Sequence, residues 1–244
     1  MSWAFDDADG SGIDVAVVDS GVDHEHPDAL GPVWPGIALS WDPDEQVVVA
    51  EEGAHDDLYG HGTACAAIIR KAAPNSRIAS VRVLGSRLSG KGEVFAAGLR
   101  WAIDNGARVV NLSLSTGKSE MFSLFHEVAD EAAHAGVVLV AAMNNVFAPT
   151  FPSQFSSVIS VAACDGTDPF RLLANPNPPA DFGAPGLDLE LAWMDKGRIV
   201  ATGNSFAAPH VTGLVARLLS KHPELTPYQV KAVLRSIAAN ATSG

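Results

Sequence analysis

Five short stretches of the chain are rich in Val and Ile and lack the regular apolar–polar alternation of a strand with one face in water. They cover residues 13–18, 78–84, 107–112, 137–142 and 158–163. Such stretches predict strands that are buried on both faces, as in a parallel sheet with helices on either side.

Helical patterns lie between or after these stretches, over residues 63–73, 93–105, 120–135, 205–221 and 226–239. Gly106 and Gly136 directly follow two of them, where a glycine commonly ends a helix. The last pattern opens with Thr226 and Pro227, an N-cap residue followed by proline at the first helical position. Strands alternating with helices predict a three-layer α/β fold, with a mostly parallel central sheet and helices on both faces.

The chain has no internal repeat, low-complexity tract or linker, so residues 1–244 are predicted to form a single domain. Two irregular stretches, residues 31–59 and 165–200, are long enough to be functional loops.

Composition narrows the classes of protein. Hydrophobic residues make up 47% and charged residues 18% of the 244, which is enough apolar material for a sizeable core. The longest uncharged apolar run, residues 137–143, is far too short to cross a bilayer, so no membrane span is expected. With 16 basic and 28 acidic residues and no Lys/Arg cluster, the chain lacks the basic footprint of a nucleic-acid-binding protein.

The N-terminus and the cysteines favour a reducing, cytoplasmic location. The N-terminus has no basic region followed by an apolar stretch, so no secretory signal is expected. Two cysteines, Cys65 and Cys164, are too few for a disulfide framework.

Three reactive side chains stand at the ends of predicted elements. Asp19 follows the first strand, at the edge where open α/β sheets bind their ligands. His61 lies between two glycines at the opening of a helix, and Ser205 lies at a helix N-terminus, where unpaired N–H groups favour negative charge. Each has an ordinary alternative: a turn or N-cap aspartate, a cap or surface histidine, and an N-cap serine.

Two observations favour chemistry over these alternatives. Pro209 removes an early hydrogen bond of the helix that starts near Ser205, and broken local rules cluster at functional sites. Together, the three residues supply a nucleophile, a base and a carboxylate that orients the base. Acyl transfer needs this set, because an unassisted serine hydroxyl is a poor nucleophile at neutral pH.

The order Asp-His-Ser and the residues around these positions resemble the subtilisin-like serine proteases, the subtilases. The matching segments are DSG at 19–21, HGT at 61–63 and GNSFAAPH at 203–210, and the likeness runs from about residue 14 to residue 234. The resemblance implies a subtilisin-like fold, no cofactor, and an endopeptidase that cleaves peptides or proteins through Asp19, His61 and Ser205 with an acyl-enzyme intermediate.

The resemblance also assigns an oxyanion-binding residue. The segment VAAMNN, residues 140–145, aligns with the family segment that ends in the oxyanion-hole asparagine, which places the role on Asn145 rather than Asn144. A side-chain donor there would stabilise the charge that develops on the tetrahedral intermediate.

By the same resemblance, two extended edges bind the substrate. One consists of Ser113, Leu114 and Ser115, which match the strand that lines the primary specificity pocket, and the other of Leu88, Ser89 and Gly90. A peptide between them would be held by main-chain hydrogen bonds as an added strand.

Some segments depart from the family. Asp28 occupies a calcium-ligand position, but the loop that supplies the partner ligands is missing, and a hard cation needs about six to eight oxygens, so no metal is expected. Val146 and Phe147 carry no charge, which favours an apolar substrate residue before the scissile bond. Only residues 1–18 precede Asp19, so no propeptide is expected in this chain.

Cys65 falls where the thiol-dependent branch of the family has its cysteine. The helical spacing places it one turn below His61. It is interpreted as a small buried apolar residue whose thiol, if it carried a mercurial, would press on His61.

Other interpretations are weaker or stay open. Residues 85–92, GSRLSGKG, nearly match a phosphate-binding loop but have glycine where the Mg²⁺-binding hydroxyl belongs. Residues 23–26, DHEH, lack the i, i+4 spacing of metal ligands. The main hypothesis is an intracellular or precursor-processing endopeptidase, and the alternatives are a catalytically silent peptide-binding relic and a general esterase.

Overall fold

The computed structural model describes residues 2–146, 148–175 and 179–241. In chain order the elements are α1 (Ser2–Phe5), β1 (Asp14–Asp19), β2 (Ile37–Asp42), β3 (Val47–Glu52), α2 (His61–Ala72), β4 (Arg77–Arg82), α3 (Gly92–Asp104), β5 (Val109–Leu112), the 3₁₀ helix η1 (Ser119–Met121), α4 (Phe122–His134), β6 (Val138–Ala142), β7 (Ile159–Cys164), β8 (Leu173–Ala174), β9 (Phe182–Pro185), β10 (Leu189–Ala192), the 3₁₀ helix η2 (Met194–Lys196), β11 (Arg198–Ala201), α5 (Asn204–Lys221) and α6 (Pro227–Ile237).

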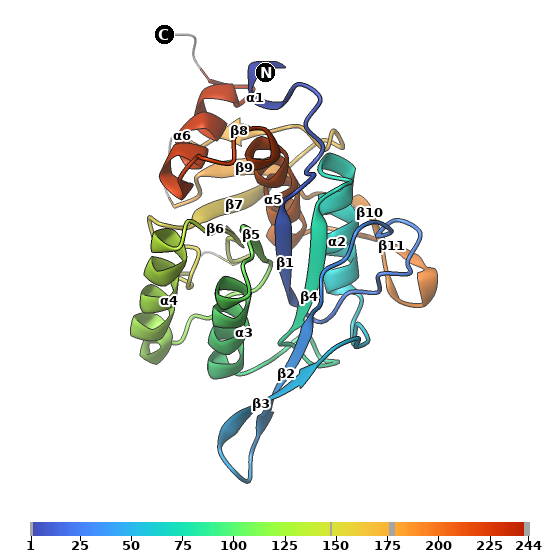
Figure 1. Cartoon of the computed structure of the whole chain (residues 1–244), viewed down its shortest axis with the longest axis vertical. Helices are drawn as coiled ribbons and strands as arrows, with labels where there is room; N and C mark the ends of the chain where they lie inside the picture. Colours follow the sequence, from blue (N-terminus) through green and yellow to red (C-terminus); the bar gives the residue numbers. More distant parts are fainter. Residues whose placement is uncertain (1, 147, 176–178, 242–244) are drawn as a thin grey trace.

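Within the described residues, nine strands form one sheet in the order β3-β2-β4-β1-β5-β6-β7-β9-β8 (Figure 1). The pairs from β2 across to β9 are parallel, and the outermost pairs, β2–β3 and β8–β9, are antiparallel. β10 and β11 form a separate antiparallel pair.

The central strand β1 explains the layering. Val15 and Val17 point into a core shared with α2 and α5, whereas Ala16 and Val18 point into a core shared with α3 and α4. All four residues are fully buried. Because successive side chains of a strand point to opposite faces, such a strand needs apolar residues throughout. The predicted three-layer α/β fold is confirmed.

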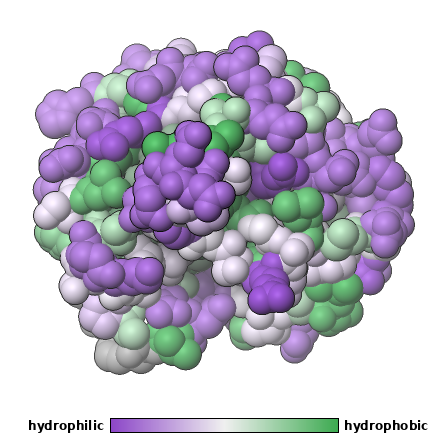
Figure 2. Space-filling model, turned by 90° about the horizontal axis from the view of Figure 1, so that it is seen from below, coloured by the Kyte–Doolittle hydropathy of each residue, from purple (hydrophilic) through white to green (hydrophobic). Residues whose placement is uncertain are grey.

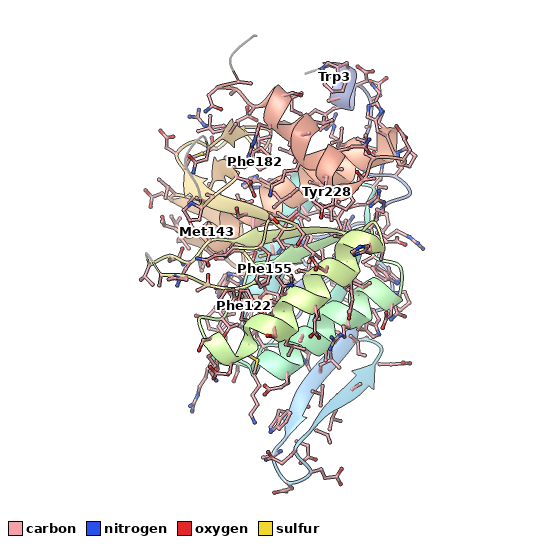
Figure 3. All side chains as sticks on the ribbon, turned by 90° about the vertical axis from the view of Figure 1, so that its left-hand side faces the viewer. Trp3, Phe122, Met143, Phe155, Phe182 and Tyr228 are labelled. Carbon is pink, nitrogen blue, oxygen red and sulfur yellow. The ribbon has the colours of Figure 1, made fainter. Side chains whose placement is uncertain are left out.

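α3 and α4 lie side by side on their face of the sheet (Figures 1 and 3). At the start of α4 the rings of Phe122 and Phe155 meet with centroids 5.4 Å apart, and Phe151 stacks on Phe155 at 5.5 Å. This aromatic cluster holds residues 151–155, which directly follow residues 143–150, against the start of α4.

Two stretches predicted as irregular contain strands. Residues 31–59 contain the β2–β3 hairpin, and residues 165–200 contain β8, β9, β10 and part of β11. The sequence signal was weak because β3, VVVAEE, is a largely exposed edge strand, and β8 to β11 have only two to four residues each. The hairpin projects from the molecule (Figure 1) and points toward the viewer in Figure 2.

The carboxyl ends of the parallel strands meet at one edge of the sheet, the lower edge in Figure 1. β1 ends there at Asp19, and α2 and α5 both begin there. No helix in the described parts of the chain is both long and apolar enough to cross a bilayer.

The buried His210 on α5 is expected to make the stability of the folded chain depend on pH. Burial and the nearby Lys71 ammonium lower the pKa of His210 to about 4. As the pH falls from about 6.5 toward 4, the His210 imidazole is protonated in the unfolded chain but stays neutral in the folded chain. The free energy of unfolding is therefore expected to fall by up to about 3 kcal/mol across that window.

Denaturant unfolding between pH 6.5 and 5 measures this effect. His210→Leu is expected to flatten the slope of stability against pH, since the carboxylates that also titrate are common to both proteins. His126→Leu, at an exposed position of α4, serves as the matched control and should keep the wild-type slope. An unchanged slope in His210→Leu would contradict the assignment.

Candidate active site

Asp19, His61 and Ser205 form one hydrogen-bonded chain. Nδ1 of His61 lies 2.9 Å from both carboxylate oxygens of Asp19, and Nε2 lies 3.0 Å from Oγ of Ser205. Asp19 is fully buried and His61 is 4% exposed, whereas Ser205 is half-buried. The imidazole thus lies between a buried carboxylate and an accessible hydroxyl, as proton transfer from serine requires.

The backbone around His61 is fixed by Asp57, a residue that sequence analysis did not single out. Its carboxylate accepts hydrogen bonds from Gly60 N at 2.8 Å, Thr63 N at 2.9 Å and Thr63 Oγ1 at 2.6 Å, so it holds the first turn of α2 in place. Gly62 passes so close to Gly21 that a Cβ would collide with the Gly21 carbonyl oxygen. The sequence signal was weak, because Asp57 lies three residues before the N-cap Gly60, outside the position at which an aspartate commonly caps a helix.

Asp19 governs the protonation of His61. Burial by itself would lower the pKa of the imidazole, but the adjacent Asp19 carboxylate outweighs it and raises the pKa well above 6.5. A base must be neutral to accept a proton. The ability of His61 to act as a base therefore grows as the pH rises through this raised pKa.

The carbonyl of Ser205 is free for a tertiary contact because of Pro209, four residues further along α5. Proline has no N–H to bond that carbonyl within the helix. Ser113 Oγ donates to it instead at 2.7 Å, and Asn111 Nδ2 donates to Ser113 Oγ at 3.0 Å. Asn111 of β5 and Ser113 thus form a buried polar network that fixes the backbone of Ser205.

Asn145 stands next to the nucleophile. Its Oδ1 accepts a hydrogen bond from the backbone N–H of Asn204 at 2.9 Å, and its side chain is exposed. Oδ1 of Asn144 instead accepts from Val146 N within its own turn, at 3.3 Å. Of the two candidates, Asn145 is therefore the one whose side chain contacts the backbone next to Ser205.

The two predicted substrate edges differ in structure. Residues 113–115 directly follow β5, whereas residues 88–90 lie in the loop between β4 and α3, where Leu88 has a left-handed backbone with φ 51°. β4 and β5 are the two neighbours of β1 in the sheet. The side chain of Ser113 points inward to Ser205, which leaves its backbone for any contact with a peptide. A cleft of about 430 Å³ adjoins Ser89 and Gly90, and β2 lines its far side.

The predicted preference for an apolar substrate residue was based on Val146 and Phe147. Val146 is 65% exposed, and Phe147 lies outside the described residues. The preference for an apolar substrate residue stays a prediction.

Two groups bear on metal binding. Asp28, at the position of the family's calcium ligand, accepts hydrogen bonds from Arg198 Nε at 3.0 Å and from Arg198 Nη2 at 2.8 Å, so both of its carboxylate oxygens are paired with an arginine. Within the described part of the chain, the one cluster of three metal-ligand side chains is Asp19, His61 and Cys65, whose ligand atoms lie within 4.8 Å of one another. It coincides with the hydrogen-bonded chain described above.

Cys65 packs under the histidine. It is fully buried, with Sγ 3.9 Å from His61 Nδ1 and 3.4 Å from Ser113 Oγ, and burial raises the pKa of its thiol. A mercurial on this sulfur has no free space and is expected to displace the imidazole and abolish peptide hydrolysis.

Hydrolysis rates before and after mercurial treatment test this packing inference. Cys65→Ala should keep its activity in mercurial, and Cys164→Ala, which removes the second, half-buried thiol, should stay as sensitive as the wild type. Full activity of mercurial-treated wild-type protein would disprove the inference.

A buried carboxylate, an imidazole and an accessible serine hydroxyl at the carboxyl edge of a parallel α/β sheet define a hydrolase that works through a serine nucleophile. The family model described as the subtilase family matches residues 10–244. Among curated proteins, thermitase of Thermoactinomyces vulgaris is 34% identical over 89% of this chain and 78% of its own length. A subtilisin of Bacillus pumilus is 31% identical over 94% of this chain and 84% of its own length.

Solved structures agree. A cold adapted subtilisin-like serine proteinase superposes with a TM-score of 0.74 at 27% identity, over 97% of this chain and 86% of its own. Sphericase matches the fold with a TM-score of 0.76 at 24% identity, over 92% and 82% of the two chains. The chain belongs to the subtilase family, and its activity is that of a serine-type endopeptidase.

Proposed function

We propose that Asp19, His61 and Ser205 are the catalytic triad and that Asn145 completes an oxyanion hole with the backbone N–H of Ser205. His61 Nε2 takes the proton of Ser205 Oγ as that oxygen attacks the scissile carbonyl carbon. Asp19 holds the ring through Nδ1 and stabilises its positive charge. The negative oxygen of the tetrahedral intermediate accepts hydrogen bonds from the two proposed donors.

The intermediate then collapses in two stages. His61 returns its proton to the leaving amine as the C–N bond breaks, which leaves an acyl group on Ser205. A water molecule enters, His61 takes one of its protons, and the resulting hydroxide attacks the ester. Collapse of the second intermediate restores the serine hydroxyl and releases the carboxylic acid.

The observation that carries this proposal is the position of His61 Nε2, 3.0 Å from Ser205 Oγ with Nδ1 held by Asp19. The partly exposed Ser205, together with residues 113–115 after β5 and the loop residues 88–90 after β4, supports a peptide laid between these two edges.

Labelling with a fluorophosphonate probe tests the nucleophile. The wild-type protein is expected to form a stable adduct at Ser205, which peptide mapping locates, and Ser205→Ala should lose it. Hydrolysis of a denatured protein should run in parallel with labelling. Absence of both would favour the silent relic, and cleavage of activated esters without peptide bonds would favour the esterase.

We further propose that this endopeptidase acts in a reducing intracellular compartment on particular peptides or precursors. The two cysteines support the location, because both thiols are free and neither forms a disulfide. Subcellular fractionation of source cells, with an antibody against the chain, tests the location. Recovery of the protein only from the secreted fraction would contradict it.

A further inference from the structure

The residue just before the nucleophile links two strands to the active site. Asn204 is the first residue of α5, and its Oδ1 accepts the backbone N–H of Ala163 in β7 at 2.8 Å. Its Nδ2 donates to the carbonyl oxygens of Met143 at 3.2 Å and Asn144 at 3.0 Å, directly after β6. One carboxamide therefore satisfies three backbone groups at the ends of two strands.

The backbone of Asn204 completes the contact with the same segment. Its N–H donates to Oδ1 of Asn145 at 2.9 Å. An asparagine amide is planar, so fixing Oδ1 also fixes the direction of Nδ2, the atom that would donate to an oxyanion. Four hydrogen bonds thus join residue 204 to β7 and to residues 143–145.

Helix capping does not explain this side chain. The N-cap of α5 is Gly203, and the carboxamide of Asn204 bonds to the ends of β6 and β7 instead of to an N–H in the first turn of its own helix. The side chain holds a segment outside the helix, and that segment carries Asn145.

We propose that Asn204 is a positioning residue that keeps the amide of Asn145 at a fixed distance from the Ser205 hydroxyl. The inference rests on the proposed function, because it assumes that Asn145 binds the oxyanion. A donor stabilises the transition state only where it meets the developing charge, and a misplacement of about 1 Å can cost about 100-fold in rate.

The test is a double-mutant cycle between residues 204 and 145. Asn204→Ala is expected to lower kcat for a peptide substrate by about tenfold or more, with KM changed less than about twofold, since the contact matters mainly in the transition state. In an Asn145→Ala background the same change should lower kcat by less than about threefold, because no donor is left to position. Equal fold-losses in both backgrounds, or a loss confined to KM, would overturn the proposal.

A matched control separates positioning from stability. Asn240 makes the same kind of bridge far along the chain, accepting Ala174 N at 2.7 Å and donating to Ala174 O at 2.7 Å. Asn240→Ala should lower the melting temperature and leave kcat unchanged. If Asn204→Ala does not fold, Asn204→Ser, whose hydroxyl can keep one of the three bonds, is put through the same cycle with the same criteria.

The proposed function can fail separately. If wild-type Ser205 takes no fluorophosphonate and the protein cleaves no peptide, the catalytic assignment is wrong and the positioning role falls with it. If the wild type is active but the cycle is additive, only the role of Asn204 is wrong.

Discussion

Ser205→Ala and His61→Ala are each expected to lower kcat by about 10⁶-fold, the size found when either partner is removed from subtilisin, a relative of this chain. The two side chains meet at 3.0 Å and act on one proton, so each is of little use without the other. The double variant is therefore expected to lose no more activity than either single variant. Single-turnover hydrolysis of a peptide amide, followed over hours, measures all three.

Matched controls lie on the same elements or on the surface. Ser220→Ala changes a serine at the far end of α5, and His134→Ala changes an exposed histidine at the end of α4; both should retain wild-type kcat. Strictly multiplicative losses in the double variant would show that Ser205 and His61 work independently, against the proposed proton transfer.

Asp19→Asn is expected to lower kcat by about 10⁴-fold at neutral pH. The carboxylate accepts the proton of Nδ1 and so leaves Nε2 as the acceptor for serine. An amide at this position can instead donate to Nδ1, which places the ring proton on Nε2, where it blocks the base.

The pH profile of kcat/KM adds a readout with a defined sign. Wild-type activity should rise with pH through a pKa above 6.5, because the carboxylate favours the protonated ring. In Asp19→Asn that attraction is lost while burial remains, so the midpoint should move to lower pH. Asp14→Asn, at the other end of β1 where the carboxylate pairs with Arg77, should keep the wild-type rate and midpoint. A midpoint that does not move would mean that Asp19 does not set the protonation of His61.

The buried central strands could be predicted from the sequence because each of their residues is apolar and faces one of the two cores. Val15 and Val17 face one core and Ala16 faces the other, so β1 stands out as an uninterrupted apolar run. β3 does not, since an edge strand is specified by its pairing with β2 more than by its own side chains. The five predicted strands and five predicted helices correspond to β1, β4 to β7 and α2 to α6, with ends that differ by at most two residues.

For the site, the reactive residues were recognisable and their supports were not. Asp19, His61 and Ser205 lie at the ends of β1, α2 and α5, where local patterns reveal them. The contacts of Asn204 join residues 41 to 61 positions apart, and nothing in the local sequence encodes them. Ser113 stays a predicted part of the substrate edge through its backbone. Its hydroxyl donates to the freed carbonyl of Ser205, a consequence of Pro209 that is visible only once the helix is packed.

Both ends of the described chain, α1 and the residues after α6, lie at the top of the molecule in Figure 1, whereas β1 ends, and α2 and α5 begin, at the lower edge of the sheet. A tag, a fused domain or a linker to a solid support attached at either end would therefore leave the surface around Ser205 unobstructed. Immobilised protein held by its N-terminus and by its C-terminus should hydrolyse a large protein substrate equally well.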